Sequence, residues 1–301
     1  MTGEAMSATL AWERDGCDWP NREASCFMRV AGVRWHVQVM GQGPCLLLLH
    51  GTGASTHSWR DLAPRLSTRF CVVAPDLPGH AFTKNTHPDL LSLPGMARAV
   101  KALLDALGAT PALVAGHSAG AAVLVRMTLT GLIAPRALVS LNGALLPLSG
   151  LAGQVFSPAA RLLASTSLVP RLFAWRAREI GVVEQLIRDT GSKIDPVGIE
   201  FYRRLASNSG HVAAALGMMA NWDLELLARD LPSLEPPLLL VVGGSDRTIP
   251  PEDAFRVRDL LPSSSVEYLR GLGHLAHEEQ PDLIAAIIRR VALAGGVLPT
   301  E

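Results

Sequence analysis

The sequence predicts an α/β fold in which helices cover both faces of a mostly parallel, eight-stranded sheet and a helical cap is inserted into the chain. Three observations predict it. Short apolar runs alternate with helical patterns along most of the 301 residues. Most of these runs are continuously apolar, as in strands buried on both faces. One gap of about 90 residues between two strands holds only helical patterns and is too long for a loop.

The first two predicted strands differ from the later ones. The second alternates apolar and polar side chains, as a half-buried antiparallel strand does, whereas the later runs indicate parallel strands with right-handed crossovers. The eight strands are predicted at Phe27–Val30, Arg34–Val39, Cys45–Leu49, Phe70–Ala74, Ala112–Ala115, Ala137–Leu141, Leu238–Val242 and Val266–Leu269.

Amphipathic patterns predict the helices between these strands and the organisation of the chain. We expect an N-terminal extension (1–26), a core made of 27–143 and 233–301, and a cap at 144–232. The core helices are predicted at Ser58–Leu66, Leu93–Leu107, Ala119–Leu132, Glu252–Leu261 and Pro281–Leu293.

Composition excludes several classes of partner and compartment. Lys plus Arg equals Asp plus Glu at 27, so nothing favours a nucleic acid as partner. The longest apolar runs have the length of strands, whereas a membrane helix needs roughly 20 residues, and the N-terminus lacks the apolar core of a signal peptide. We therefore expect a cytoplasmic protein without a transmembrane segment. The four cysteines show no C-x-x-C pair, and no cofactor or metal is predicted.

The most specific local motif is Gly116-His117-Ser118-Ala119-Gly120. This G-x-S-x-G sequence directly follows a predicted strand and directly precedes a helix, which is the context that a nucleophile elbow requires. The turn is so tight that side chains at the flanking positions would clash, which explains the glycines. Ser118 is therefore the predicted nucleophile.

A serine hydroxyl needs a base to take its proton and a carboxylate to orient that base. Asp246 and His274 each follow the end of a predicted strand, at the same edge of the sheet as Ser118, and in the chain order that this architecture uses. His274 is favoured over His277 because a glycine frees its loop. The alternatives for the acid are Asp223, Asp253 and the non-ionisable Asn142.

Acyl chemistry also needs two backbone donors for the developing oxyanion. One is the amide of Ala119, and the other is expected in the loop after the first parallel strand, at Thr52 with Gly53 as the register alternative. That loop lacks a phosphate-binding motif. Three further histidines, His50, His80 and His117, lie in turns next to the site and are expected to support the loops by hydrogen bonds. The others have no partner at metal-ligand spacing, so they indicate no metal site. They are His36, His57, His87 and His211.

These residues together resemble the α/β-hydrolase superfamily, from about Phe27 onward. The match comprises His50-Gly51, the run Asp76 to His80, the elbow, Asp246 and Gly273-His274 in that order, with Ala81 where many members have a glycine. The resemblance implies the α/β-hydrolase fold.

A closer resemblance is to the α/β-hydrolases encoded with the bacteriochlorophyll genes of phototrophic bacteria, the magnesium chelatase accessory proteins. It implies a role near magnesium insertion into protoporphyrin, with magnesium chelatase subunits as partners. The segments that carry it are Asp18–Arg22, Arg34–Gln38, His50–Leu62, Leu141–Pro147, Gly210–Leu224 and Gly271–Pro281.

The cap is expected to supply the apolar part of the substrate pocket. Met218, Met219 and Trp222 form an apolar stripe, and we expect them to line the pocket together with His50, although core packing also explains such stripes. A tetrapyrrole is a flat apolar ring with carboxylates. The predicted carboxylate-binding residues are Arg171, Arg176 and Arg178.

Three functions remain open from the sequence. The first is a serine hydrolase that cleaves an ester, thioester or similar acyl bond of an apolar small molecule. The second is a porphyrin-binding or chelatase accessory protein that keeps the hydrolase scaffold with an idle triad. The third is a cofactor-free haloperoxidase or C–C bond hydrolase with the same triad. The apolar cap also leaves open peripheral contact with a membrane.

Overall fold

The eight predicted strands form one sheet in the order β1-β2-β4-β3-β5-β6-β7-β8. The computed structural model describes residues 10–84, 87–147 and 168–299. The pairs β1–β2 and β2–β4 are antiparallel and all the others are parallel, which confirms the prediction. The strands are β1 (Ser25–Val30), β2 (Val33–Met40), β3 (Cys45–Leu49), β4 (Cys71–Pro75), β5 (Leu113–His117), β6 (Ala137–Leu141), β7 (Leu238–Gly243) and β8 (Ser265–Leu269).

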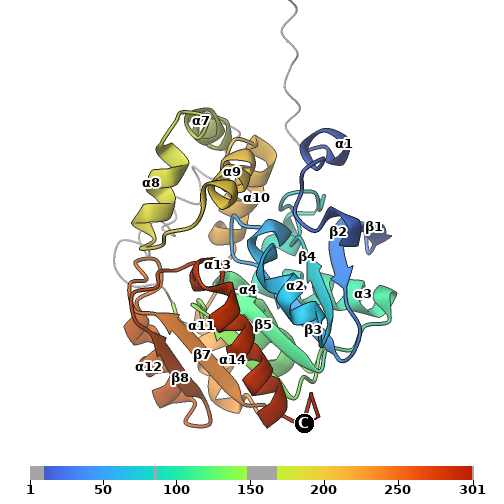
Figure 1. Cartoon of the computed structure of the whole chain (residues 1–301), viewed down its shortest axis with the longest axis vertical. Coiled ribbons are helices and arrows are strands. Elements are labelled where there is room, and N and C mark those ends of the chain that lie inside the picture. Colours follow the sequence, from blue (N-terminus) through green and yellow to red (C-terminus); the bar gives the residue numbers. More distant parts are fainter. Residues whose placement is uncertain (1–9, 85–86, 148–167, 300–301) are drawn as a thin grey trace, which may run out of the picture.

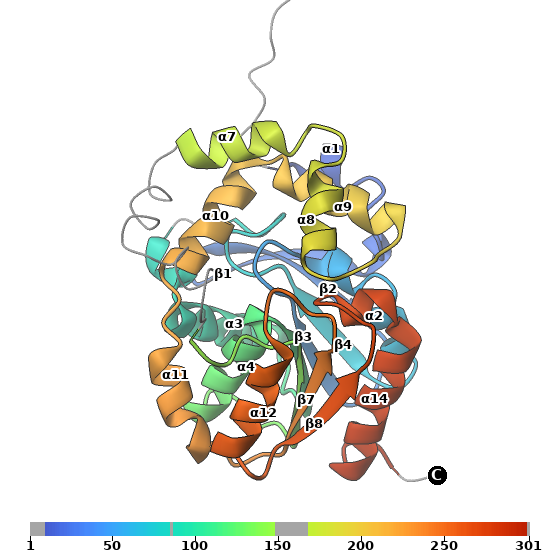
Figure 2. The same ribbon diagram turned by 90° about the vertical axis from the view of Figure 1, so that its left-hand side faces the viewer.

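Successive side chains of the central strands point to opposite faces of the sheet, and both faces are buried. Leu47 and Leu49 of β3 pack into one hydrophobic core, and Leu46 and Leu48 pack into another on the opposite face. This double burial explains why β3 is continuously apolar. Figure 2 shows the helices on the two sides of the sheet. They are α3 (Leu93–Leu107), α4 (Ala119–Leu129) and α12 (Pro251–Leu260) on the first face, and α2 (Leu62–Ser67) and α14 (Pro281–Ala294) on the second.

One predicted core helix differs from the structure. The segment expected as a single helix at Ser58–Leu66 begins as the short 3₁₀ helix η2 (Thr56–Trp59), and α2 starts only at Leu62. Pro64 lies in the first turn of α2, where its missing N–H removes no helical hydrogen bond. The start of η2 is fixed by a different contact, in which the backbone N–H of Thr56 donates to the carboxylate of Asp76.

A set of helices lies between β6 and β7, which we call the helical insert. Figure 1 shows it above one end of the sheet. Asp195 and Asn208 each begin one of its helices as N-caps, with side chains that accept backbone N–H groups. Residues 148–167 of the predicted cap lie outside the described part of the chain. The insert consists of α7 (Leu168–Arg176), α8 (Val182–Asp189), α9 (Pro196–Ala206) and α10 (Ser209–Ala220), and α11 (Glu225–Asp230) follows it on the side of α4.

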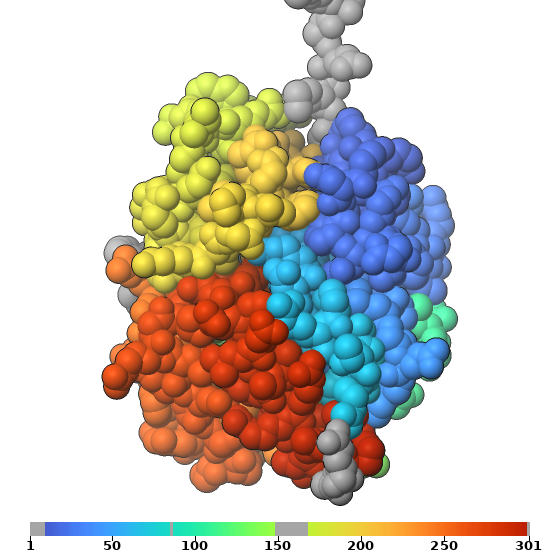
Figure 3. Space-filling view, in the orientation of Figure 1, coloured from blue at the N-terminus to red at the C-terminus, as the bar shows by residue number. Residues whose placement is uncertain are grey.

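The N-terminal segment joins the insert to the sheet, a role that the sequence did not predict. Figure 3 shows this segment, in dark blue, beside the insert, in yellow. Trp19 is buried against Phe201 of α9, and its indole N–H donates to Thr56 Oγ1 at 2.9 Å. Asp18 forms a bidentate ion pair with Arg204 of α9. The segment also contains the short helices α1 (Trp12–Asp15) and η1 (Arg22–Ala24).

Candidate active site

Ser118 lies at a sharp turn between the end of β5 and the start of α4. Its φ of 51° and ψ of −117° are strained for a residue with a side chain. A Cβ atom at Gly120 would lie 2.1 Å from the carbonyl oxygen of Leu49, and one at Gly116 would lie 2.5 Å from the nitrogen of Ala121. The backbone therefore has the form expected of a nucleophile elbow, and both glycines are required by close packing.

Asp246 and His274 lie side by side, as predicted. The distance from His274 Nδ1 to Asp246 Oδ2 is 2.8 Å. Asn142 Nδ2 donates to the same oxygen at 2.8 Å, while Oδ1 accepts the backbone N–H groups of Thr248 and Ile249. With Nδ1 bonded to the carboxylate, Nε2 is the nitrogen of His274 that can act as a base.

The other candidate acids and bases do not reach His274. His277 is buried, and its Nε2 is bonded to Ser58 Oγ at 2.7 Å. Asp253 pairs with Arg256 on α12, and Asp223 is exposed and accepts the N–H of Glu225. Asn142 assists Asp246 rather than replacing it, because its amide holds the carboxylate in place.

Ser118 and His274 line the same cavity. Within the described residues, no hydrogen bond joins Ser118 Oγ to His274. Catalytic hydrogen bonds are often long in enzymes without substrate and shorten only in the complex. The geometry thus provides an oriented imidazole and an accessible hydroxyl in one chamber.

The loop after β3 also reaches this cavity. Thr52 and Gly53 line it together with Ala119, the first residue of α4. His50 lies behind the loop rather than in the cavity wall, contrary to its predicted place. Its Nε2 accepts the N–H of Leu77 at 2.9 Å, so its Nδ1–H donates to the carbonyl of Gly51 at 2.8 Å. That carbonyl belongs to the peptide that carries the Thr52 amide, so His50 fixes the direction of this predicted oxyanion donor.

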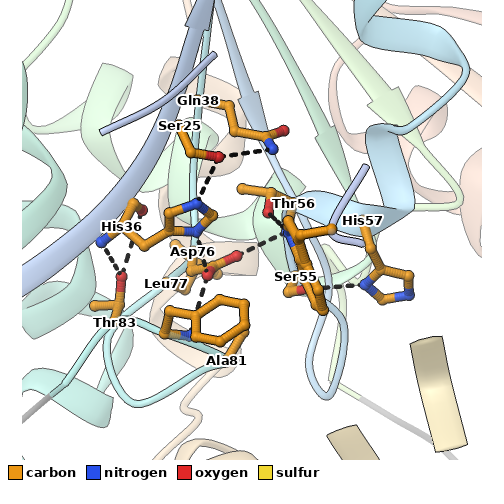
Figure 4. Close-up of polar contacts among 12 residues, drawn as sticks. Ser25, His36, Gln38, Ser55, Thr56, His57, Asp76, Leu77, Ala81 and Thr83 are labelled. Carbon is orange, nitrogen blue, oxygen red and sulfur yellow. Dashed lines mark hydrogen bonds and ion pairs between the residues drawn. The ribbon is translucent and has the colours of Figure 1, made fainter. Parts of the chain in front are cut away.

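A buried carboxylate anchors the neighbouring loops, as Figure 4 shows. Asp76 accepts the N–H of Thr56 at 2.8 Å and that of Phe82 at 3.2 Å, and it lies 2.7 Å from His36 Nδ1. Burial by itself raises the pKa of Asp76, but His36 and the hydrogen bonds outweigh it and bring the pKa to about 2. The His36 ring is held in turn by Ser25 Oγ at 3.0 Å. No local sequence pattern indicates the pairing of His36 with Asp76, because the two residues are 40 positions apart.

The cavity has a volume of about 590 Å³ and a mostly apolar wall. No Asp, Glu, Lys or Arg of the described residues lines it. Phe173 and Leu186, which are 41% and 43% exposed, lie at its rim. The insert supplies much of the wall, through Phe173, Val183, Leu186, Ile187, Thr190, Tyr202, Ala206, His211, Val212, Ala215, Leu216, Met219 and Trp222.

The predicted pocket residues divide into two groups. Met219 and Trp222 line the cavity as expected. Met218 is fully buried beside it, with its sulfur 3.4 Å from Thr52 Oγ1. The predicted carboxylate-binding residues are exposed and do not line the cavity. They are Arg171 and Arg176 on α7, the latter paired with Glu179, and Arg178 just after α7.

The connection between α8 and α9 lies between the loops that carry Asp246 and His274. The carbonyl of Thr190 accepts the N–H of Arg247 at 3.1 Å and that of His274 at 3.4 Å, and Ser192 Oγ accepts the N–H of Leu275 at 2.8 Å. Gly191, with φ of +84°, packs so closely that a Cβ atom would lie 1.9 Å from the carbonyl oxygen of Ser245. The insert is thus bonded directly to both loops.

Eight of the nine histidines are buried, so the free energy of unfolding is expected to depend on pH in the acid range. Burial lowers the pKa of six of them, to about 4 for His211 and about 3 for His277. An unfolded histidine binds a proton near pH 6.5. The remaining members of the six are His50, His57, His80 and His117.

We therefore expect the free energy of unfolding to be largest above about pH 6.5 and to fall as the pH drops toward 4, because only the unfolded chain then takes up these protons. Each histidine contributes at most about 1.4 kcal/mol per pH unit. Urea unfolding at a series of pH values measures the slope. His277→Gln should reduce it. A slope that His277→Gln does not alter would contradict this account.

Within the described residues, no helix is long and apolar enough to cross a membrane. In the same part of the chain, no group of three or more His, Cys, Asp or Glu side chains is placed to hold a metal ion.

Comparison with known proteins agrees with this geometry. The sequence model of the alpha/beta hydrolase family matches residues 46–287. The chain is 39% identical over 277 residues to the magnesium-chelatase 30 kDa subunit of Rhodobacter capsulatus, covering 90% of this chain and 95% of that relative. Its fold is similar to that of a protein from Acinetobacter baumannii described as a putative lipase, with a TM-score of 0.75, 21% identity, and 90% of this chain and 91% of that chain covered. It is also similar to that of an alpha/beta hydrolase fold protein from Burkholderia ambifaria, with a TM-score of 0.74, 25% identity, and 88% of this chain and 97% of that chain covered. Both predicted resemblances are confirmed.

Proposed function

Because this chain belongs to the alpha/beta hydrolase family, we propose that it is a serine hydrolase that cleaves an ester, thioester or related acyl bond of an apolar molecule. The observation that carries the proposal is the convergence of three features on one apolar cavity: the strained Ser118 elbow, the oriented His274–Asp246 pair and the loop at Thr52.

In the proposed mechanism, Ser118 Oγ attacks the acyl carbon while His274 Nε2 takes its proton. Asp246 holds the imidazole and stabilises the imidazolium that forms. The negative charge on the acyl oxygen is stabilised by the backbone N–H groups of Thr52 and Ala119, with Gly53 as the register alternative to Thr52. The imidazolium then protonates the leaving group, and a water molecule activated by the same histidine releases the acid from Ser118.

The cavity wall favours a substrate that is uncharged around the reacting bond. Burying a charge against this wall would be costly, since no side chain there compensates it. A carboxylate bound by Arg171, Arg176 or Arg178 would have to project beyond the rim. We propose that the substrate is a tetrapyrrole or a similar flat apolar molecule, because of the similarity to the magnesium-chelatase subunit.

The same similarity supports a place in bacteriochlorophyll biosynthesis at the magnesium-chelatase step, with chelatase subunits as partners. The site of action that we propose is the cytoplasm. The exposed apolar side chains of α7, Leu172 and Trp175 among them, would be the surface for peripheral contact with a membrane.

Labelling with a fluorophosphonate tests the proposal. The Ser118 oxygen should bond to phosphorus as fluoride leaves, and peptide mapping should find the adduct on Ser118. Ser140→Ala, which removes a buried serine of β6, should label like the wild type. An apolar acyl ester or protoporphyrin should protect the site. Absence of an adduct on Ser118 in folded protein would refute the proposed function.

A second candidate function is a non-catalytic porphyrin-binding or chelatase accessory protein. The missing hydrogen bond between Ser118 and His274 and the large apolar cavity favour it. In that case porphyrin would bind while Ser118 stays unreactive.

A further inference from the structure

His211 of α10 bridges the loop after β3 and the loop after β4. Its Nδ1 accepts the backbone N–H of Ala81 at 3.0 Å, and its Nε2 lies 3.0 Å from the carbonyl oxygen of Gly53. A ring nitrogen that accepts an N–H cannot carry a proton itself, so the proton is on Nε2 and is donated to Gly53. The structure thus fixes both the tautomer and the neutral state of this imidazole.

The arrangement repeats that of His50 from the opposite side. Each imidazole accepts an amide N–H from the loop after β4 and donates to a glycine carbonyl in the loop after β3, so the carbonyls of Gly51 and Gly53, on either side of Thr52, are both held. His50 directly follows strand β3 of the sheet, whereas His211 belongs to α10 of the helical insert.

We propose that His211 is a positioning residue through which the insert holds the loop that carries the predicted oxyanion donor Thr52, with Gly53 as the register alternative. The Gly53 carbonyl belongs to the peptide that carries the Ala54 amide, and that amide donates to the carbonyl of Gly51 at 3.2 Å, so His211 holds the far end of the turn to which Thr52 and Gly53 belong. The proposal rests on the proposed hydrolase function. Both ring nitrogens are occupied, so His211 offers only ring carbon to the cavity and acts through the loop.

The helix α10 is already packed against the loop after β4, so it cannot move closer to compensate for a shorter side chain at position 211. A Cβ atom at Gly79 would lie 2.5 Å from the Cβ of Ala214, so α10 already touches the loop after β4. Asn208 caps α10 by accepting the N–H of His211, which fixes the start of the helix. A smaller side chain at position 211 would therefore leave Gly53 and Ala81 without their partners rather than draw the helix inward.

The surroundings keep His211 neutral. Burial lowers its pKa to about 4, although the bond to Gly53 and the charge of Asp76 oppose that shift. His50 also faces it, and His80 packs edge-on against its ring at 5.2 Å. A protonated ring would present an N–H to the N–H of Ala81 and break the bridge.

Three substitutions separate the two halves of the bridge. His211→Asn places an amide oxygen near the position of Nδ1 and retains the bond to Ala81. His211→Gln places an amide nitrogen near Nε2 and retains the bond to Gly53. His211→Phe retains neither. With a p-nitrophenyl ester of an apolar acid, kcat should fall about 10- to 100-fold in the Phe and Asn variants, with KM changed less than about threefold, and His211→Gln should recover most of the rate. His87→Asn is the control.

Amide hydrogen exchange gives a readout that does not depend on turnover. Exchange in residues 50–55 should increase in the Phe and Asn variants and stay near the wild-type rate in His211→Gln, while β5 stays protected in all of them. Unchanged exchange in residues 50–55, or a kcat equal to that of the wild type in His211→Phe, would overturn the positioning role. If exchange responds as expected but the wild type neither turns over esters nor labels at Ser118, the bridge stands and the proposed hydrolase function fails.

Discussion

Replacing Ser118 by alanine is expected to lower kcat for an apolar ester by about 10⁴-fold or more, because Ser118 is the nucleophile of the proposed mechanism and no other serine or cysteine of the described residues lines the cavity. Binding should be nearly unchanged. The hydroxyl is a small part of a wall with many apolar side chains, so the Kd for protoporphyrin, measured by quenching of tryptophan fluorescence, should shift less than about threefold.

The same variant separates the two candidate functions. In a strain that lacks the gene, the wild type should restore pigment synthesis, and Ser118→Ala should not if acyl hydrolysis is the physiological role. Ser140→Ala should restore synthesis fully, because that serine does not line the cavity. Equal rescue by Ser118→Ala would identify a binding or accessory role on a hydrolase scaffold.

Asp246→Asn is expected to lower kcat by about 10³- to 10⁴-fold while the protein stays folded. The carboxylate accepts four hydrogen bonds, from His274, Asn142 and two backbone N–H groups. An asparagine must turn its NH₂ toward one of these donors. If that donor is His274, the imidazole adopts the other tautomer, with Nε2 protonated and unable to act as a base.

Asp253→Asn is the matched control, since Asp253 pairs with Arg256 on α12 and makes no contact with His274. Its kcat and pH profile should equal those of the wild type. Steady-state kinetics across pH measures both variants. A kcat for Asp246→Asn within about tenfold of the wild type would show that another group orients the base.

Much of the sheet and of the site could be predicted because their signals are local. A strand buried on both faces must be apolar throughout, so β3 and β7 were visible as runs of sequence. The elbow demands glycines on both sides of Ser118. Asp246 and His274 could be placed because parallel strands bring their carboxyl ends to one edge.

Other parts of the site depend on contacts between distant segments that no local pattern reveals. The cavity wall includes Tyr202 and Ile187, which belong to different helices of the insert and resemble ordinary core residues in sequence. The bonds of His211 to two loops and of His36 to Asp76 join residues that are 40 or more positions apart. The three arginines were predicted as partners for the carboxylates of a tetrapyrrole, and the sequence pattern could not show that all three side chains are exposed.

The bonds that Thr190 and Ser192 make to the loops of Asp246 and His274 restrict how a ligand gets in and out. A rigid-body movement of the insert away from the sheet would break these bonds and remove the supports of the Asp246 and His274 loops. We therefore expect uptake and release to proceed through rotations of exposed lining side chains such as Phe173 and Leu186, which leave the bonds of Thr190 and Ser192 in place. In the proposed hydrolase, bulky products would leave slowly by this route, and we expect product release rather than bond cleavage to limit turnover.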